Sequence, residues 1–149
     1  MEKPVIISIR GTQSIQAGQE DVMELVTQGT LSDAGEDYSF TYEESELTGL
    51  EGTTTTFYIG KDQIVLKREG TLTTEMIFQV GQKHLSLYQT PFGGIMLGVN
   101  TRKAFSDIGQ HGGRLSIHYT MEVENERVGE NTFEIFVSEP TSASLPLQQ

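Results

Sequence analysis

The chain has 149 residues, of which 36% are apolar and 21% are charged, so it is long enough for one buried core and short for two domains. It contains no cysteine, which excludes disulfides, thiolate catalysis, iron–sulfur clusters and cysteine-based zinc sites. A formal net charge of −11, without a basic run, argues against nucleic acid and membrane surfaces as partners. No stretch is apolar enough to span a membrane and no secretion signal is evident, so we expect a cytoplasmic protein.

Period-two alternation of apolar residues dominates the chain and predicts an all-β fold. The clearest alternating stretches lie at 5–10, 38–43, 64–68, 95–101, 115–123 and 133–137. Less regular candidates at 22–28, 53–59, 75–80 and 84–89 bring the expected count to eight to ten strands. Glycine-rich turns separate these stretches, so from about residue 38 onward we expect sequential antiparallel neighbours. Residues 105–113 lack alternation, which predicts a loop or a short helix there.

The number of strands also bears on the architecture. An antiparallel sheet of eight to ten strands removes its exposed edges when it closes into a barrel. We therefore predict one antiparallel barrel domain over residues 1–139, with a two-sheet sandwich as the alternative. Residues 140–149 contain two prolines and no periodic apolar face, which predicts a poorly ordered tail whose removal leaves the melting temperature unchanged.

Several short motifs occur together along the chain. The most specific runs from Tyr42 to Gly49 and reads YEESELTG, followed by GTTT from Gly52 to Thr55. The others are Gly11-Thr12-Gln13, Arg68-Glu69-Gly70, Met76-Ile77-Phe78, Thr90-Pro91-Phe92-Gly93 and Gly113-Arg114-Leu115. In order and spacing they resemble the uncharacterised YwiB-like β-barrel family of Gram-positive bacteria. The resemblance implies a calycin-like barrel, the broad architecture of lipocalins, in a small cytoplasmic protein, and it implies no activity and no catalytic residues.

The residue types that usually carry catalysis or bind metals form no recognisable pattern. The three imidazoles, His84, His111 and His118, are not spaced to place two ligands on one strand face, so no metal site and no cofactor is predicted. The chain has neither a GxSxG nor an HExxH motif. No catalytic residue is therefore assigned, and an enzyme is the least favoured class of function.

Two strands are predicted to continue their inward apolar phase into a charged residue. Glu44 follows Tyr42 in this phase, and Arg68 follows Leu66. Both charges should point inward near a barrel end, where burial is costly without a partner, and each is a candidate partner of the other. One interpretation is an ion pair that closes a barrel end. The other is that Arg68 binds the carboxylate of a ligand.

Three aromatic residues complete the candidate site. In the ligand interpretation, Tyr42 or Tyr88 supplies a hydroxyl beside Arg68. Phe92 lies in a Pro-Phe-Gly-Gly segment, which is typical of a tight hairpin and would also suit a mobile lid with an aromatic tip. The candidate ligand-binding residues are therefore Tyr42, Glu44, Arg68, Tyr88 and Phe92.

Two hypotheses about function remain. The first is a binding module for a small apolar, amphipathic or carboxylate ligand in the barrel lumen. The alternative is a non-enzymatic interaction protein or homodimer that uses outward-facing apolar residues such as Ile6, Val65, Ile77 and Phe136. A filled lumen would separate the two hypotheses, and the sequence does not show whether the lumen is filled.

Overall fold

Ten strands account for most of the residues that the computed structural model describes, which are 2–16, 19–34, 37–46, 50–70, 73–90 and 93–140. The strands are β1 (Glu2–Gln16), β2 (Gln19–Ala34), β3 (Asp37–Glu43), β4 (Thr53–Ile59), β5 (Ile64–Gly70), β6 (Thr74–Phe78), β7 (Lys83–Thr90), β8 (Gly93–Ser106), β9 (Gly112–Val123) and β10 (Glu126–Ser138). No helix occurs in these ranges, so the all-β prediction is confirmed. Phe92 and the tail beyond Pro140 lie outside the described residues.

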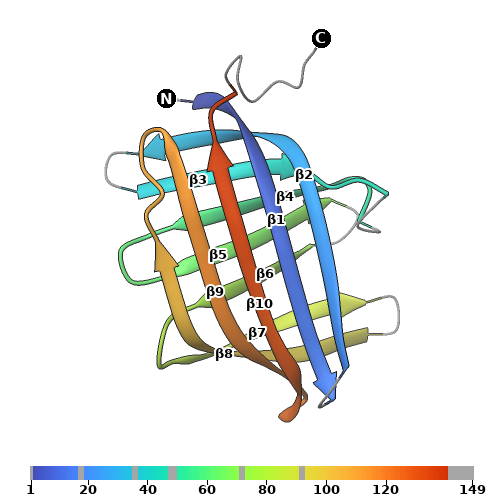
Figure 1. The fold of residues 1–149 in the computed structure, drawn as a ribbon. Helices are drawn as coiled ribbons and strands as arrows, with labels where there is room; N and C mark the ends of the chain where they lie inside the picture. The colour runs from blue at the N-terminus through green and yellow to red at the C-terminus, as the bar shows by residue number, and fades with distance from the viewer. Residues whose placement is uncertain are drawn as a thin grey trace.

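The strands form one antiparallel sheet that curls into a nearly closed barrel. Its order is β6-β5-β4-β3-β2-β1-β10-β9-β8-β7, so the first and last strands of the chain pair with each other in the middle of the sheet. Figure 1 shows the long strands β1, β2, β9 and β10 in front and the shorter strands β3 to β6 behind them. The predicted antiparallel barrel is therefore confirmed.

The expected pairing of sequential strands is confirmed except between β6 and β7. The ladder runs without interruption from β3 to β6 and from β7 to β10, but β6 and β7 are the two ends of the sheet order. In the linker between them, the Gly81 amide donates to the Thr101 carbonyl at 3.1 Å and the Gln82 amide donates to the Gln79 carbonyl at 3.0 Å. Because these bonds turn the linker towards β8, the hairpin ladder between β6 and β7 does not form. The described part of the barrel thus keeps two sheet edges, contrary to our expectation that closure would remove both.

The segment 105–113 divides between a strand and a turn. Strand β8 extends to Ser106, two residues into the predicted loop, and β9 begins at Gly112. Between them, Gly109 and Gly112 exchange backbone hydrogen bonds of 2.9 and 3.1 Å. Of the two interpretations left open for this segment, the loop is thus the correct one for residues 107–111.

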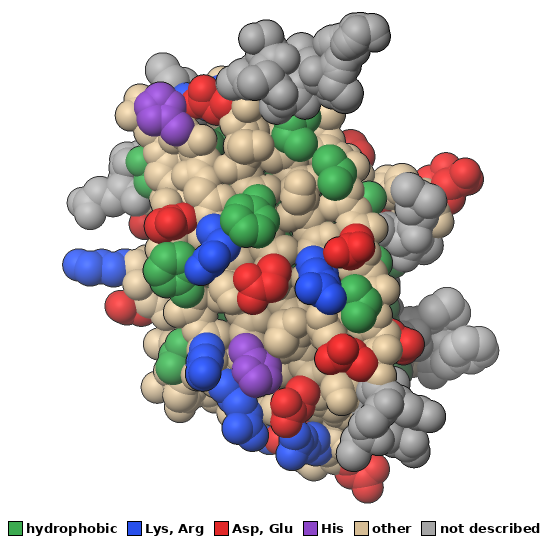
Figure 2. Space-filling view, viewed as in Figure 1, with side chains coloured by type: hydrophobic (Ala, Val, Ile, Leu, Met, Phe, Trp, Pro, Cys, Tyr) green, Lys and Arg blue, Asp and Glu red, His purple; other side chains and the backbone are tan. Residues whose placement is uncertain are grey.

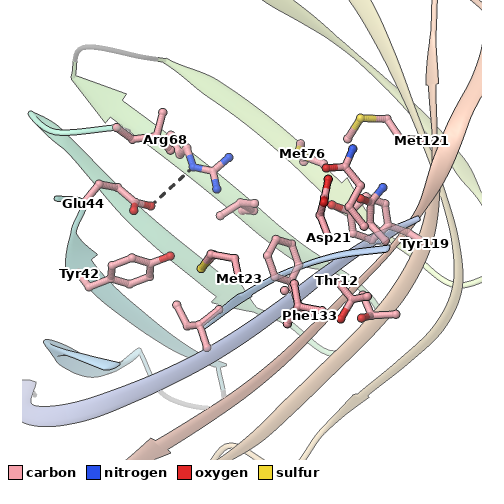
Figure 3. A pocket seen from close by; sticks show the side chains of 18 residues that line it. Thr12, Asp21, Met23, Tyr42, Glu44, Arg68, Met76, Tyr119, Met121 and Phe133 are labelled. Atoms are coloured by element: carbon pink, nitrogen blue, oxygen red, sulfur yellow. Dashed lines mark ion pairs between the residues drawn. The ribbon is translucent and has the colours of Figure 1, made fainter. Parts of the chain in front are cut away.

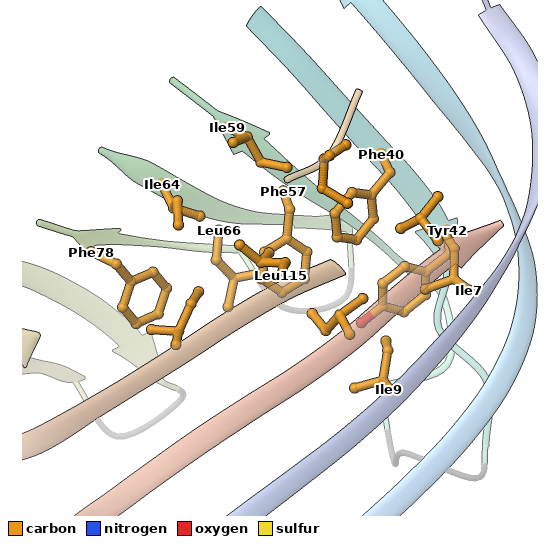
Figure 4. Close-up of a cluster of buried hydrophobic side chains, with 14 of the residues drawn as sticks. Ile7, Ile9, Phe40, Tyr42, Phe57, Ile59, Ile64, Leu66, Phe78 and Leu115 are labelled. Carbon is orange, nitrogen blue, oxygen red and sulfur yellow. The ribbon is translucent and has the colours of Figure 1, made fainter. Parts of the chain in front are cut away.

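The centre of the lumen is filled by side chains. Phe40, Leu66, Ile117 and Ile135 are fully buried, as the alternation predicted, whereas their neighbours in sequence remain at least partly exposed. The ring centroids of Phe40 and Phe57 lie 5.0 Å apart in a stacked arrangement. Figure 4 shows Phe40, Phe57 and Leu66 between the shorter strands and the long strands. The packed core therefore confines any internal cavity to the barrel ends.

Gly29 lies where β2 acquires its second neighbour. Strand β2 pairs with β1 over nearly its whole length and with β3 only from Gly29 onward. A Cβ atom at this position would overlap the Thr41 carbonyl oxygen and lie 2.5 Å from Ile7 Cδ1. The close approach of the two walls at this corner therefore requires a glycine.

We expect Gly29→Ala to lower the free energy of unfolding by about 1–3 kcal/mol, because the added methyl group has no space. Urea unfolding of the variant measures the loss. Gly11→Ala on the adjacent strand is the matched control, since a Cβ there would meet Met23 and Phe133 at an ordinary 3.8 Å. Equal losses in the two variants would contradict the steric explanation.

Candidate functional site

A cavity of about 380 Å³ lies at one end of the barrel, between the front strands and the ends of β3, β5 and β6 (Figure 3). This volume is within the range of sites that bind small molecules. Polar and apolar side chains are mixed in its wall, since the front strands contribute Asp21 and Asn131 as well as Met23. We call the part that contains Tyr42, Glu44 and Arg68 the polar wall. The lining residues are Ile9, Gly11, Thr12, Gln13, Asp21, Val22, Met23, Tyr42, Glu44, Leu50, Leu66, Arg68, Met76, Tyr119, Met121, Asn131, Thr132 and Phe133.

The strand register places the polar wall. Tyr42 on β3 is the cross-strand partner of Thr55 on β4, and Thr55 is in turn the partner of Arg68 on β5. Glu44 follows the end of β3, where its amide donates to the Thr53 carbonyl at 2.8 Å. The inward phase of three neighbouring strands therefore brings Tyr42, Glu44, Thr55 and Arg68 to the same end of the barrel.

Glu44 is a buried carboxylate with compensating partners. Its side chain is only 2% exposed, and Arg68 Nε lies 3.8 Å from its Oε2 atom. The Thr55 hydroxyl donates to the same oxygen at 2.5 Å. A carboxylate at this depth is stabilised by such a cation and donor. The structure thus brings together the two charges that the sequence predicted to point inward, in the geometry of an ion pair at a barrel end.

Arg68 has donors that the ion pair does not use. Its side chain is 21% exposed, and its Nε atom is buried without a hydrogen bond to any described residue. In Figure 3 the two terminal nitrogens point away from Glu44, and the guanidinium forms part of the cavity wall. Glu44 therefore orients the guanidinium of Arg68, and the terminal nitrogens of Arg68 face the cavity.

Two tyrosine hydroxyls in the wall stay protonated at neutral pH. Burial, the nearby negative charge of Glu44 and a hydrogen bond with its carboxylate raise the pKa of Tyr42, although Arg68 acts in the opposite direction. Burial raises the pKa of Tyr119 to about 12, again against the effect of Arg68. Both hydroxyls are thus neutral groups that can donate or accept a hydrogen bond.

The structure separates the five predicted site residues. Tyr42, Glu44 and Arg68 line the cavity. Tyr88 is half-buried on β7, across the break from β6, and does not line it. Phe92 lies outside the described residues.

Several lining residues were not predicted as part of a site. Tyr119 and Phe133 form an aromatic wall on β9 and β10, with ring centroids 6.0 Å apart, and Met23, Met76 and Met121 add flexible apolar surface. The alternation of β9 and β10 did predict that Tyr119, Met121 and Phe133 point inward. It carried no signal for which distant strands they would meet.

Other kinds of site are not evident in the described chain. Over these residues, no group of three or more His, Asp or Glu side chains could hold a metal ion. No helix that could cross a membrane occurs in the same ranges.

The fold and the cavity together define a small antiparallel barrel protein with an amphipathic site at one end. A family model described as a domain of unknown function (DUF1934) matches residues 7–135, and the chain belongs to that family. It is 25% identical over 127 residues to the uncharacterised β-barrel protein YwiB of Bacillus subtilis strain 168, covering 85% of this chain and 87% of that protein. The crystal structure of the ywiB protein from Bacillus subtilis shares the fold, with a TM-score of 0.81, 22% identity and 94% coverage of both chains. The resemblance to the YwiB-like family is thus confirmed.

We expect Arg68→Met to lower the free energy of unfolding by about 1–3 kcal/mol, because Glu44 loses its cation but keeps the Thr55 hydroxyl. The double variant with Glu44→Gln should recover much of this loss, since a neutral amide needs no cation. Chemical unfolding of the four proteins measures the coupling. Lys67→Met is the control, because Lys67 is 40% exposed on the outside of the same strand. Strictly additive losses would contradict a stabilising pair.

The raised pKa of Tyr119 predicts a pH dependence of stability. Above pH 10 the unfolded chain loses the Tyr119 proton while the folded protein keeps it, so this stabilising contribution is present below pH 10 and disappears as the pH rises through about 12. Tyr119→Phe has no such proton. Between pH 8 and pH 11, the free energy of unfolding of the wild type should therefore fall by about 1 kcal/mol more than that of the variant. Guanidinium unfolding at the two pH values measures this difference. A constant difference between pH 8 and pH 11 would contradict the shift.

Proposed function

We propose that the cavity binds a small amphipathic molecule whose carboxylate, or a similar acceptor group, is bound by Arg68. The observation that carries the proposal is a guanidinium in the cavity wall whose buried Nε lacks a hydrogen bond and whose terminal nitrogens face the cavity. The terminal nitrogens are charged donors in a fork, and a ligand carboxylate can accept from them while Glu44 stays on the Nε side. The Tyr42 and Tyr119 hydroxyls are neutral partners at the same end.

The apolar part of the ligand would contact the opposite wall. Met23 and Phe133 supply apolar surface there, and Met76 on β6 adds more on the side of Arg68. Methionine side chains adapt to ligands of different shape, because they are unbranched and polarisable. Since packed side chains fill the middle of the lumen, the ligand would occupy only one end of the barrel.

The two interpretations of the Glu44–Arg68 pair are compatible. Glu44 Oε2 lies 3.8 Å from Arg68 Nε and attracts this side of the guanidinium. The direction of the remaining donors of Arg68 is thus fixed before a ligand arrives. Such preorganisation reduces the entropy that binding must overcome. A carboxylate ligand would add a negative charge to a protein of net charge −11, so we also expect its affinity to rise with ionic strength.

The proposal is tested by calorimetry and thermal unfolding with octanoate, decanoate and 3-phenylpropionate. The alcohols of the same skeletons serve as uncharged controls. An acid that binds should stabilise the wild type by about 2.7 kcal/mol at a hundred times its dissociation constant. Arg68→Met should lose this stabilisation, whereas Lys67→Met, which removes a charge from the outside of β5, should retain it.

Two outcomes would contradict the proposal. If no acid in the series stabilises the wild type, the cavity does not bind this class of ligand. If each alcohol binds as tightly as its acid, and Arg68→Met binds as tightly as the wild type, the cavity is an apolar site in which Arg68 has only a structural role. The calycin-like likeness adds no weight here, because a barrel fold alone does not confer a function.

A further inference from the structure

A row of three polar side chains crosses the front strands on the inside of the cavity. Asp21 on β2 pairs with Gln13 on β1, and Gln13 pairs with Asn131 on β10. All three line the cavity, because the phase that points Met23 and Phe133 inward continues two residues further along the strands. Each of the three carries a side-chain oxygen that accepts hydrogen bonds, so we call them the acceptor row.

Asp21 is the charged member of the acceptor row, and no cation of the protein pairs with it. Every lysine, arginine and histidine side chain lies in the described part of the chain, and none of them forms an ion pair with Asp21. The outer face of the front strands differs, because basic and acidic side chains are interspersed on it (Figure 2). There, Arg10 Nε lies 3.8 Å from Oε2 of Glu24, which is an outward-facing residue of the same strand as Asp21. The outward carboxylate is thus paired and the inward one is not.

The lining of the cavity has an excess of negative charge. Its charged side chains are Asp21, Glu44 and Arg68. Because Glu44 and Arg68 form an ion pair, the excess is the charge of Asp21. A ligand that brings only a carboxylate increases this excess, in a protein whose net charge is already −11. A ligand that also carries a cation does not.

The acceptor row lies across the cavity from Arg68. Figure 3 shows Asp21 on the far side of the cavity from Arg68, with the side chains of Met23 and Phe133 between them. Neighbouring strands are about 4.8 Å apart, so a group placed over Gln13, the middle residue of the row, is within reach of both flanking side chains. A primary ammonium has three N–H donors, which matches the three side-chain oxygens of the row. The row therefore suits an ammonium at the end of an apolar segment.

We propose that the ligand of the cavity is zwitterionic, with its carboxylate on Arg68, a primary ammonium on the acceptor row and an apolar segment between the two. This inference rests on the proposed function and adds a second charged group to the ligand. Asp21 selects such a ligand, because it is the only charged residue of the row. Since Asp21 is exposed, we expect it to favour the zwitterion over the plain acid by about fivefold in affinity.

Calorimetry with matched pairs of ligands tests the proposal. The probes are 6-aminohexanoate, 8-aminooctanoate and 10-aminodecanoate, and each is compared with the fatty acid of the same carbon number. At one chain length or more, the wild type should bind the amino acid about fivefold more tightly than the plain acid, although the ammonium makes the ligand less apolar. Asp21→Asn should lose this preference and bind the plain acid at least as tightly as the wild type. Glu24→Gln is the matched control, because it removes a carboxylate from the outer side of the same strand, and it should keep the preference.

Ionic strength gives a second readout. The preference for the amino acid should fall when salt is raised from about 0.02 M to about 0.5 M, because salt screens an exposed carboxylate from the ammonium. Asp21→Asn and Glu24→Gln each remove one negative charge from the protein, so the long-range field changes equally in both. The fall should therefore be clear in Glu24→Gln and much smaller in Asp21→Asn.

The proposal is overturned if no amino acid in the series binds more tightly than its plain acid, or if Asp21→Asn keeps the preference. The plain acids separate this result from a failure of the proposed function. If they bind to the wild type and not to Arg68→Met, while the amino acids show no preference, the carboxylate site stands and the zwitterionic ligand does not. If Arg68→Met binds the acids and the amino acids as tightly as the wild type, the proposed function fails, and the zwitterionic ligand fails with it.

Discussion

The ladder between β1 and β10 is the interaction on which the rest of the barrel depends. The sheet consists of one run of strands from β1 to β6 and another from β7 to β10, and among the described residues strand pairing joins the two runs only between β1 and β10. Nine residue pairs, from Ile6 with Ser138 to Ser14 with Glu130, form this junction. It closes a loop of more than a hundred residues, so its formation carries a large entropic cost that the buried front wall must offset.

The cavity is a product of this junction. Its polar wall, with Glu44 and Arg68, comes from the first run of strands, whereas Tyr119 and Phe133 come from the second. Neither run encloses the space alone. The charge of Arg68 acts across this space to lower the pKa of Tyr119, against the larger effect of burial. Folding of the two runs against each other and formation of the site are therefore one event.

The sequence predicted those features that depend on side-chain phase within a single strand. Alternation identified the buried sides of β3, β5, β9 and β10, and the interruption of that phase by a charge identified Glu44 and Arg68. The break between β6 and β7 was not predictable in this way, because it depends on backbone hydrogen bonds of Gly81 and Gln82 that have no side-chain signature. Tyr88, which was expected to offer a hydroxyl beside Arg68, lies on β7 beyond this break and does not line the cavity.

The break between β6 and β7 gives the barrel a seam. Every other junction between neighbouring strands is fixed by a ladder, so a change in barrel circumference there would require hydrogen bonds to break. At the seam no ladder would have to break. The wall is held there by the hydrogen bond from the Gly81 amide to the Thr101 carbonyl and by the packing of Phe78 on β6 against Tyr119 on β9, whose ring centroids lie 4.8 Å apart. The barrel thus resembles a ring with one cut, which side-chain packing and single hydrogen bonds close in place of a ladder. Met76 of the cavity lies on the strand that borders this line, so one part of the cavity wall lacks the continuous ladder that fixes the rest.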